Sequence, residues 1–318
     1  MVADNIDGAA WRRIAWRVVL ASSCMLASCQ RASAPSAPAS APTRVTATAA
    51  QPASAAPTPS RGAPDDTPDA LMREAFPDWG GQKAFVTEIA AENPKDGSTI
   101  VAILPEFVVA LDDTHRVLVT RSPLSDEGGR VGGGHPMPGA VGGYWFVARG
   151  GRWFVTRRED AMLWDGAMGE VGAIAPLDLG ASHHAITVTN GDCHQGACTE
   201  WVDVIELAPD KSHLALGGLQ LASRYDGFDG RCSDFLTGGK AALAVGPGDC
   251  VDISGKWHLE PNADAAWPDM VVTFTGHELA RDPAASAVAS KAVDETQVLR
   301  YKAGKYVPVS GRNPVHGF

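Results

Sequence analysis

The sequence predicts an all-β protein built as an antiparallel meander of hairpins, and two observations lead to this class. From Thr99 onward, short runs of Val, Ile, Leu and aromatic residues alternate with Gly, Asp, Asn and Pro, which is typical of strands joined by tight turns. Two segments, at 145–157 and 298–309, also have the pattern of a β-hairpin. No strict repeat marks the period of a propeller blade, so closure is left open between a propeller-like array and a sandwich.

The first of these hairpins is the clearest element. Trp-Phe-Val-Ala-Arg is followed by Gly150 and Gly151, and Trp-Phe-Val-Thr-Arg then nearly repeats the first strand. Two glycines supply the positive φ angles that a two-residue hairpin turn requires. In this register Val147 faces Phe154. Both faces of the ribbon are apolar, so we expect it to lie centrally in a sheet with cover on each side.

The second hairpin lies near the end of the sequence. It turns at Ala303 and Gly304 and places Tyr301 opposite Tyr306, a cross-strand aromatic pair. The segment 299–306 resembles the final hairpins of Gram-negative envelope lipoproteins and exported β-repeat proteins. This resemblance supports the β class and implies no chemistry.

The remaining elements are shorter. A helix is predicted at 69–76, with Thr67 or Asp69 as its N-cap, and 82–91 fits either a strand or a short helix. Further strands are predicted at 99–104, 107–111, 116–120, 185–189, 201–207, 214–221, 243–245, 251–253, 256–259 and 270–275.

The N-terminal part of the chain has the features of an export signal. Three arginines precede an apolar run at 18–28, which is as long as the hydrophobic part of a signal peptide and far short of the ~20 residues that span a bilayer. The run ends in Leu-Ala-Ser-Cys at 26–29. This arrangement resembles the lipobox of bacterial lipoprotein precursors, in which the signal peptide is removed and the cysteine is acylated.

The resemblance implies that Cys29 is the lipidated first residue of a mature, palmitate-carrying membrane lipoprotein. Gln30 stands where an Asp would favour inner-membrane retention in enterobacteria-like lipoproteins, so the implied location is the outer membrane, facing the periplasm or the cell surface. Two alternatives stay open. Cys24 follows Ala-Ser-Ser and lacks the large aliphatic residue, and an ordinary signal peptide could hold an incidental cysteine.

A linker separates this anchor from the folded part. Residues 30–67 contain twelve Ala and seven Pro and no aromatic residue, so the segment has too little apolar surface to offset the entropy of ordering it. We therefore predict a signal peptide at 1–28, a lipidated N-terminus with a disordered linker at 29–67, and a single all-β domain at 68–318.

Four cysteines follow the linker, an even number that suggests two disulfides in an exported chain. We predict the pairs Cys193–Cys198 and Cys232–Cys250, because each closes a local loop. The alternative is a zinc site that uses Cys193, His194 and Cys198. It is disfavoured because no second unit with zinc-ligand spacing follows.

The sequence contains no catalytic, dinucleotide or phosphate-binding motif, and we predict no cofactor and no metal. A net charge of −10 with no basic tract argues against nucleic-acid binding. The glycine-rich segment 128–143 is predicted to be a loop, and His135, Tyr144 and Trp145 are the candidate ligand surface. The expected function is a non-catalytic binding or assembly module for an envelope protein or glycan. The alternative is an envelope hydrolase that acts on glycan, peptide or lipid.

Overall fold

The residues that the computed structural model describes are 64–180, 183–225, 232, 250–281 and 288–316. The predicted signal peptide, Cys29, most of the linker and the strand at 243–245 lie outside them. All of these described residues belong to one compact unit. Within the described ranges, no helix is both long and apolar enough to cross a bilayer.

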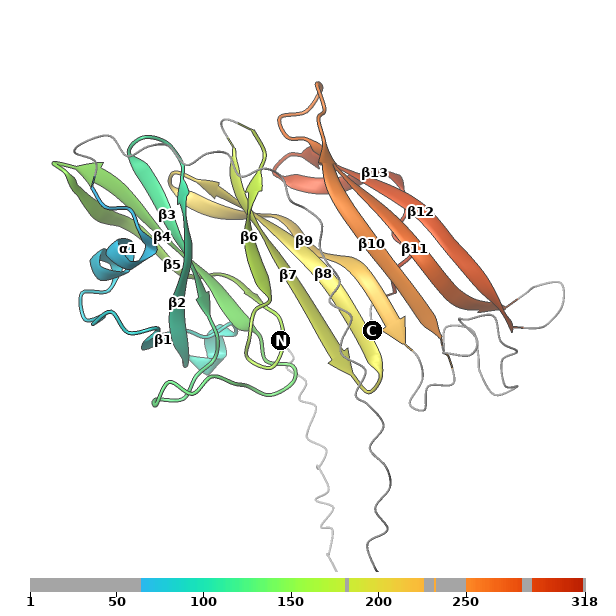
Figure 1. Cartoon of the computed structure of the whole chain (residues 1–318), viewed down its shortest axis with the longest axis horizontal. Helices are drawn as coiled ribbons and strands as arrows, with labels where there is room; N and C mark the ends of the chain where they lie inside the picture. The colour runs from blue at the N-terminus through green and yellow to red at the C-terminus, as the bar shows by residue number, and fades with distance from the viewer. Residues whose placement is uncertain (1–63, 181–182, 226–231, 233–249, 282–287, 317–318) are drawn as a thin grey trace, which may run out of the picture. The chain divides into compact units, whose positions relative to one another are not determined.

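The chain folds into two antiparallel sheets, each a meander in which every strand pairs with its neighbours in the sequence (Figure 1). This confirms the all-β class and the antiparallel meander, and the strands form two sheets rather than the blades of a propeller. The five-stranded sheet consists of β1 (Phe85–Ala90), β2 (Ser98–Ala110), β3 (His115–Ser122), β4 (Gly139–Arg149) and β5 (Arg152–Asp165).

The eight-stranded sheet follows directly in the chain. Its order runs backwards from β13 to β6, again with sequence neighbours side by side. The strands are β6 (Ala173–Asp178), β7 (His184–His194), β8 (Ala197–Ala208), β9 (Lys211–Tyr225), β10 (Val251–Glu260), β11 (Asp269–Arg281), β12 (Val288–Lys302) and β13 (Lys305–Gly311).

The helix α1 (Pro68–Ala75) precedes both sheets and confirms the prediction at 69–76. The hydroxyl oxygen of Thr67 accepts a hydrogen bond from the backbone N–H of Ala70 at 3.3 Å, so Thr67 is the N-cap. Phe76 is the C-cap, and Pro77 follows it, a residue that cannot continue a helix. The undecided segment 82–91 contains a strand, β1.

Both predicted hairpins form with the expected register. Val147 pairs with Phe154, and Tyr301 pairs with Tyr306. The expected central position of the first hairpin is wrong for its second strand, because β5 is an edge of its sheet and Phe154 is 45% exposed. Of the two strands of this hairpin, only β4 is buried on both faces along most of its length.

Three apolar clusters form the core. The first lies within the five-stranded sheet and against α1, and it includes Leu71, Met72 and Tyr144. The second lies within the eight-stranded sheet around Trp267, whose ring stacks on that of Tyr301 at 3.8 Å. The third joins the two sheets through β3 and β4 on one side and β7 and β8 on the other.

Each sheet is curled. This follows from contacts between strands that are not adjacent in the strand order of the sheet. In the five-stranded sheet the two edges, β1 and β5, contact each other. In the eight-stranded sheet β13 contacts β9, and the Nε2 atom of His213 lies 2.6 Å from the carbonyl oxygen of Gly304. The curl of the first sheet leaves a seam between its edges, next to α1.

Candidate functional site

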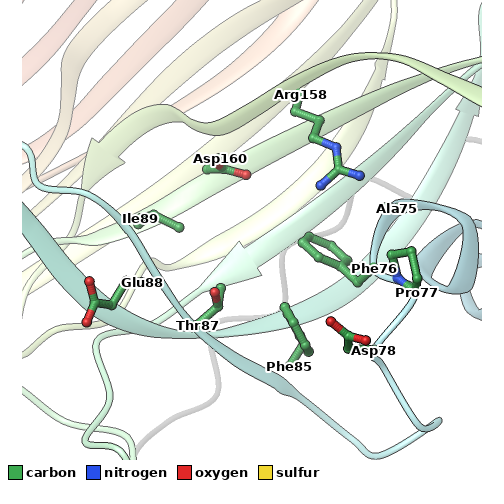
Figure 2. A pocket seen from close by; sticks show the side chains of 10 residues that line it. All are labelled: Ala75, Phe76, Pro77, Asp78, Phe85, Thr87, Glu88, Ile89, Arg158 and Asp160. Atoms are coloured by element: carbon green, nitrogen blue, oxygen red, sulfur yellow. The ribbon is translucent and has the colours of Figure 1, made fainter.

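The seam between β1 and β5 contains a cavity of about 300 Å³. Its walls come from the end of α1 and from strand β1, which are close in the sequence, and from the middle of β5, which is distant from both (Figure 2). The lining residues are Ala75, Phe76, Pro77, Asp78, Phe85, Thr87, Glu88, Ile89, Arg158 and Asp160.

The apolar wall of the cavity is aromatic. The rings of Phe76 and Phe85 lie 4.8 Å apart, and the ring of Phe76 meets that of Tyr144 edge to face at 5.0 Å. The end of α1 at Pro77 places Phe76 here, because the chain must leave the helix at this point. Phe85 and Ile89 point to the same face of β1, since side chains two or four residues apart share a face of a strand.

The polar wall comes mainly from β5. Arg158 and Asp160 are two residues apart and therefore lie on the same face of the strand. The guanidinium of Arg158 lies 5.7 Å from the ring centre of Phe76, within the range of a cation–π contact (Figure 2). Asp160 accepts a hydrogen bond from the hydroxyl of Tyr144 at 2.9 Å. Burial, and then the negative charge of Asp160, raise the pKa of Tyr144.

The opposite rim adds the carboxylate of Asp78, which follows the end of α1. Glu88 belongs to the other face of β1, where its carboxylate accepts a hydrogen bond from the hydroxyl of Ser98 at 2.8 Å (Figure 2). The cavity therefore combines an aromatic floor with one guanidinium and the carboxylates of Asp78 and Asp160. Such a mixture suits a ligand that has both an apolar part and a charged part.

The predicted ligand surface of His135, Tyr144 and Trp145 is not assembled as a surface. Tyr144 and Trp145 are fully buried, and they belong to different core clusters. Adjacent residues of a strand point to opposite faces, and both faces of β4 are covered, so neither ring reaches solvent. The indole N–H of Trp145 donates to the carbonyl oxygen of Ala208 at 2.7 Å, which ties the two sheets together.

His135 instead lies against the β7–β8 hairpin. Its Nδ1 atom is 3.5 Å from a carboxylate oxygen of Asp192, and its ring meets that of His194 edge to face at 4.5 Å. Its Nε2 atom lies 3.4 Å from the carbonyl oxygen of Cys193. The glycine-rich loop thus rests on the tip of the neighbouring hairpin.

Both predicted disulfides are present. Cys193 and Cys198 are directly opposite each other on β7 and β8, and Cys232 is bonded to Cys250. The disulfide uses both sulfur atoms that the alternative zinc site would need. Within the described part of the chain, no group of three or more His, Cys, Asp or Glu side chains is placed to hold a metal ion.

A second polar cluster lies where β5 ends next to the eight-stranded sheet, and sequence analysis missed it. One oxygen of Asp165, Oδ2, accepts hydrogen bonds from the side-chain amide of Asn190 at 2.6 Å and from the indole of Trp201 at 2.8 Å. Asp203 lies beside this carboxylate and is only 3% exposed. Its Oδ1 atom accepts from the backbone N–H of Gly218 at 2.8 Å.

The interaction between the carboxyl groups of Asp165 and Asp203 depends on whether Asp203 carries a proton. Burial, and then the hydrogen bond with Asp165, raise the pKa of Asp203 to about 8. The Oδ2 atom of Asp203 is buried and receives no hydrogen bond from the described residues, which fits a protonated oxygen that donates to Asp165. Burial and the neighbouring carboxyl group of Asp165 thus favour the neutral acid form of Asp203.

The cavity residues could not be singled out from the sequence. The only local signals are the Phe-Pro-Asp at 76–78, where a helix must end, and the run of four charges at 157–160 on a strand. Neither shows that the two segments meet. Comparisons of the chain with protein-family models, with curated proteins and with solved structures give no match.

Proposed function

We propose that the protein is a lipoprotein of the bacterial cell envelope whose β domain binds a partner without catalysing a reaction. The anchor is supported by the signal-like run that ends in Leu-Ala-Ser-Cys at 26–29. One acyl chain holds a protein to a bilayer only weakly, whereas the several chains implied by the lipobox make attachment lasting. Gln30 favours the outer membrane as the location.

The observation that carries the binding role is the cavity between α1, β1 and β5. It combines the Phe76 and Phe85 rings with Arg158 and carboxylates on its rim. An apolar floor with a few charged groups at its edge gives both affinity and orientation. A linker rich in Pro and Ala would hold this site away from the lipid surface.

The anchor is tested by radiolabelled palmitate. Cys29→Ser is expected to abolish labelling and to release the protein into the soluble fraction, whereas the matched variant Cys24→Ser is expected to keep both label and membrane attachment. Loss of label in Cys24→Ser together with retention of label in Cys29→Ser would assign the lipid anchor to Cys24 instead. Absence of label in the wild-type chain would overturn the proposal.

The binding role is tested by photo-crosslinking in cells. A photoreactive amino acid in place of Asp78, at the cavity, is expected to give a discrete adduct. The same amino acid in place of Asp252, exposed on β10 in the other sheet, serves as the matched control and is expected to give none. Equal adducts at both positions, or none at either, would contradict a binding role for the cavity.

One observation favours a second candidate, an envelope hydrolase. Asp78 and Asp160 both line the cavity, and a pair of carboxylates is the catalytic apparatus of most glycoside hydrolases. This candidate predicts that the purified chain releases soluble fragments from cell-wall glycan and that Asp78→Asn or Asp160→Asn abolishes the release. No release by the wild-type chain leaves the binding role as the better proposal.

A further inference from the structure

The cavity contains two opposite charges that are neighbours on one strand but do not pair. Arg158 and Asp160 are two residues apart on β5, and both line the cavity (Figure 2). Opposite charges at this spacing attract each other. In the part of the chain that the structure describes, however, no ion pair joins the two side chains to each other or to a third residue. Both charges therefore remain available to a ligand.

Aromatic residues keep the two charges apart. The guanidinium of Arg158 lies over the ring of Phe76, 5.7 Å from its centre. A carboxylate oxygen of Asp160 accepts a hydrogen bond from the hydroxyl of Tyr144 at 2.9 Å, and the fully buried ring of Tyr144 fixes this carboxylate in place. Contact with a ring face leaves the N–H donors at the edge of a guanidinium free. The cavity thus presents a fork of donors beside a fixed acceptor.

The backbone of β5 is irregular at this point. Gly143 on β4 pairs with Glu159, whereas Val141 pairs with Leu163, so the register shifts over the residues that begin with Asp160. Such β-bulges are frequent next to active sites, where they re-aim a side chain. The bulge is an observation independent of the charges, and it marks the same position of the strand.

The ligand that matches these charges has an anion and a cation close together. A carboxylate fits the fork of a guanidinium through two parallel hydrogen bonds, and an ammonium group can donate to the carboxylate of Asp160. Positions two apart on a strand are separated by roughly 6.5 Å, which leaves room for both groups on one carbon atom. Asp78 adds a second carboxylate, so the cavity is negative overall and disfavours a ligand that is only an anion.

The floor of the cavity selects the rest of the ligand. The rings of Phe76 and Phe85 lie 4.8 Å apart, and aromatic rings favour tilted or edge-to-face contact with another ring. A volume of about 300 Å³ is at the lower limit of small-molecule pockets. This size suits an amino acid with one large apolar side chain.

We propose that the cavity binds a free α-amino acid with a large apolar side chain, preferably an aromatic one. Its carboxylate pairs with Arg158, its ammonium group with Asp160, and its side chain covers Phe76 and Phe85. Within a peptide chain the amino and carboxyl groups of a residue are consumed by amide bonds, so the matching charges occur together on the free amino acid. This inference rests on the proposed binding role and names the class of ligand.

The probe is phenylalanine, titrated into the full chain in detergent and followed by isothermal titration calorimetry. Phenylalanine is expected to bind saturably. Its N-acetyl derivative lacks the cation and its amide lacks the anion, so each is expected to bind about tenfold more weakly. Free glycine has both charges but no side chain and is expected to bind more weakly than phenylalanine. No saturable binding of phenylalanine, or equal binding of phenylalanine and its two derivatives, would overturn the proposal.

Variants then assign each charge to its partner. Arg158→Gln is expected to bind phenylalanine about tenfold more weakly and no longer to prefer it over its amide. Asp160→Asn is expected to lose the preference over the N-acetyl derivative. The matched control is Arg157→Gln, at the opposite face of β5, where the side chain pairs with Glu159, and it is expected to bind as the wild-type chain does. Wild-type preferences in Arg158→Gln and Asp160→Asn, or an equal loss in Arg157→Gln, would overturn the assignment.

The photo-crosslink in place of Asp78 separates this inference from the proposed function. With an amino acid as the ligand, the adduct formed in cells is expected to add the mass of one amino acid to the chain. A specific adduct with a macromolecule, together with no binding of phenylalanine, would overturn this inference and leave a binding module with another partner. Absence of both adduct and binding would remove the binding role itself.

Discussion

At the scale of single residues, Asp203 is a carboxyl group whose chemistry departs from its ordinary behaviour. Burial and the neighbouring carboxyl group of Asp165 favour the protonated form of Asp203 over the charged form. The pKa of Asp203 in the folded state is raised to about 8. Its contribution to stability is therefore complete below the pKa of the unfolded carboxyl and is lost as the pH rises through about 8.

Asp203→Asn is expected to remove this pH dependence. The amide is neutral at every pH and keeps a donor for Asp165, so the variant should not lose the roughly 1–3 kcal/mol of unfolding free energy that the wild-type chain loses between about pH 5 and pH 9. Urea unfolding at several pH values measures the difference, and Asp252→Asn on the exposed face of β10 is the control. Parallel pH profiles for Asp203→Asn and the wild-type chain would contradict the assignment.

Single residues also explain why the predicted ligand surface is wrong and why the cavity could not be predicted. The sequence predicts Tyr144 and Trp145 at a surface because they adjoin a glycine-rich loop, and loops on rigid scaffolds carry much binding function. Their burial depends on the cover of both faces of β4, which no local pattern reveals. The cavity residues Phe76 and Arg158 are 82 positions apart in the numbering, and only the curl of the sheet brings them together.

At the scale of elements, the turns follow from the sequence best, because their requirements are local. Gly150 and Gly151 have φ angles of 56° and 76°, as a two-residue hairpin turn demands. The long strands were predicted only in pieces. Pro105 interrupts the pattern at 99–111, yet β2 continues through it with an irregular register, since an edge or a bulge tolerates proline. The edge strand β6 was missed, because its sequence contains Pro176 and only two large apolar residues.

The hairpin turn provides a prediction with a built-in control. No atom lies within 4 Å of a Cβ added at Gly150 or Gly151, so any effect of substitution arises from the backbone alone. Gly151→Ala is expected to lower the unfolding free energy by about 1–2 kcal/mol, because alanine disfavours positive φ. Gly150→Asn creates the Asn-Gly turn and is expected to be neutral. Equal losses in both variants, measured by urea unfolding, would contradict this view of the turn.

The disulfide between Cys232 and Cys250 links the chain that leaves β9 to the start of β10. It closes a loop of 18 positions, and such a crosslink contributes about 3 kcal/mol by restricting the unfolded chain. The double variant Cys232→Ser with Cys250→Ser is expected to lose that amount in urea unfolding. The pair Cys193→Ser with Cys198→Ser, which opens a shorter loop of 5 positions, is expected to lose less. The reverse order of the two losses would argue against a loop-entropy effect.

At the scale of the whole molecule, the division into two sheets could not be predicted from the sequence. Within each sheet every strand pairs with its sequence neighbours, and this local rule correctly predicts a meander. No local sequence pattern shows that the first sheet ends at β5 and that the second begins at β6. The division depends on the third core cluster, in which Val119 and Trp145 of one sheet meet Ile186 and Ile205 of the other. Contacts of this kind join residues far apart in the chain, so only the folded molecule reveals them.

This shared cluster implies that the two sheets unfold together. Ile205 is 1% exposed and lies between the sheets, so Ile205→Ala is expected to lower the unfolding free energy by about 2–5 kcal/mol through the lost contacts and the cavity left behind. The control is Val309→Ala, at an exposed position on β13, with an expected change within about 0.5 kcal/mol.

The cooperative unit is then measured by hydrogen exchange. Because the hydrogen bond from Trp145 to Ala208 and the apolar contacts couple the sheets, Ile205→Ala should reduce protection in β3 and β4 as much as in β7 and β8. Loss of protection confined to the eight-stranded sheet, or two separate transitions in urea, would mean that each sheet is stable alone. In that case the curl of the five-stranded sheet, and with it the cavity at its seam, would depend only on α1 and the core that this sheet contains.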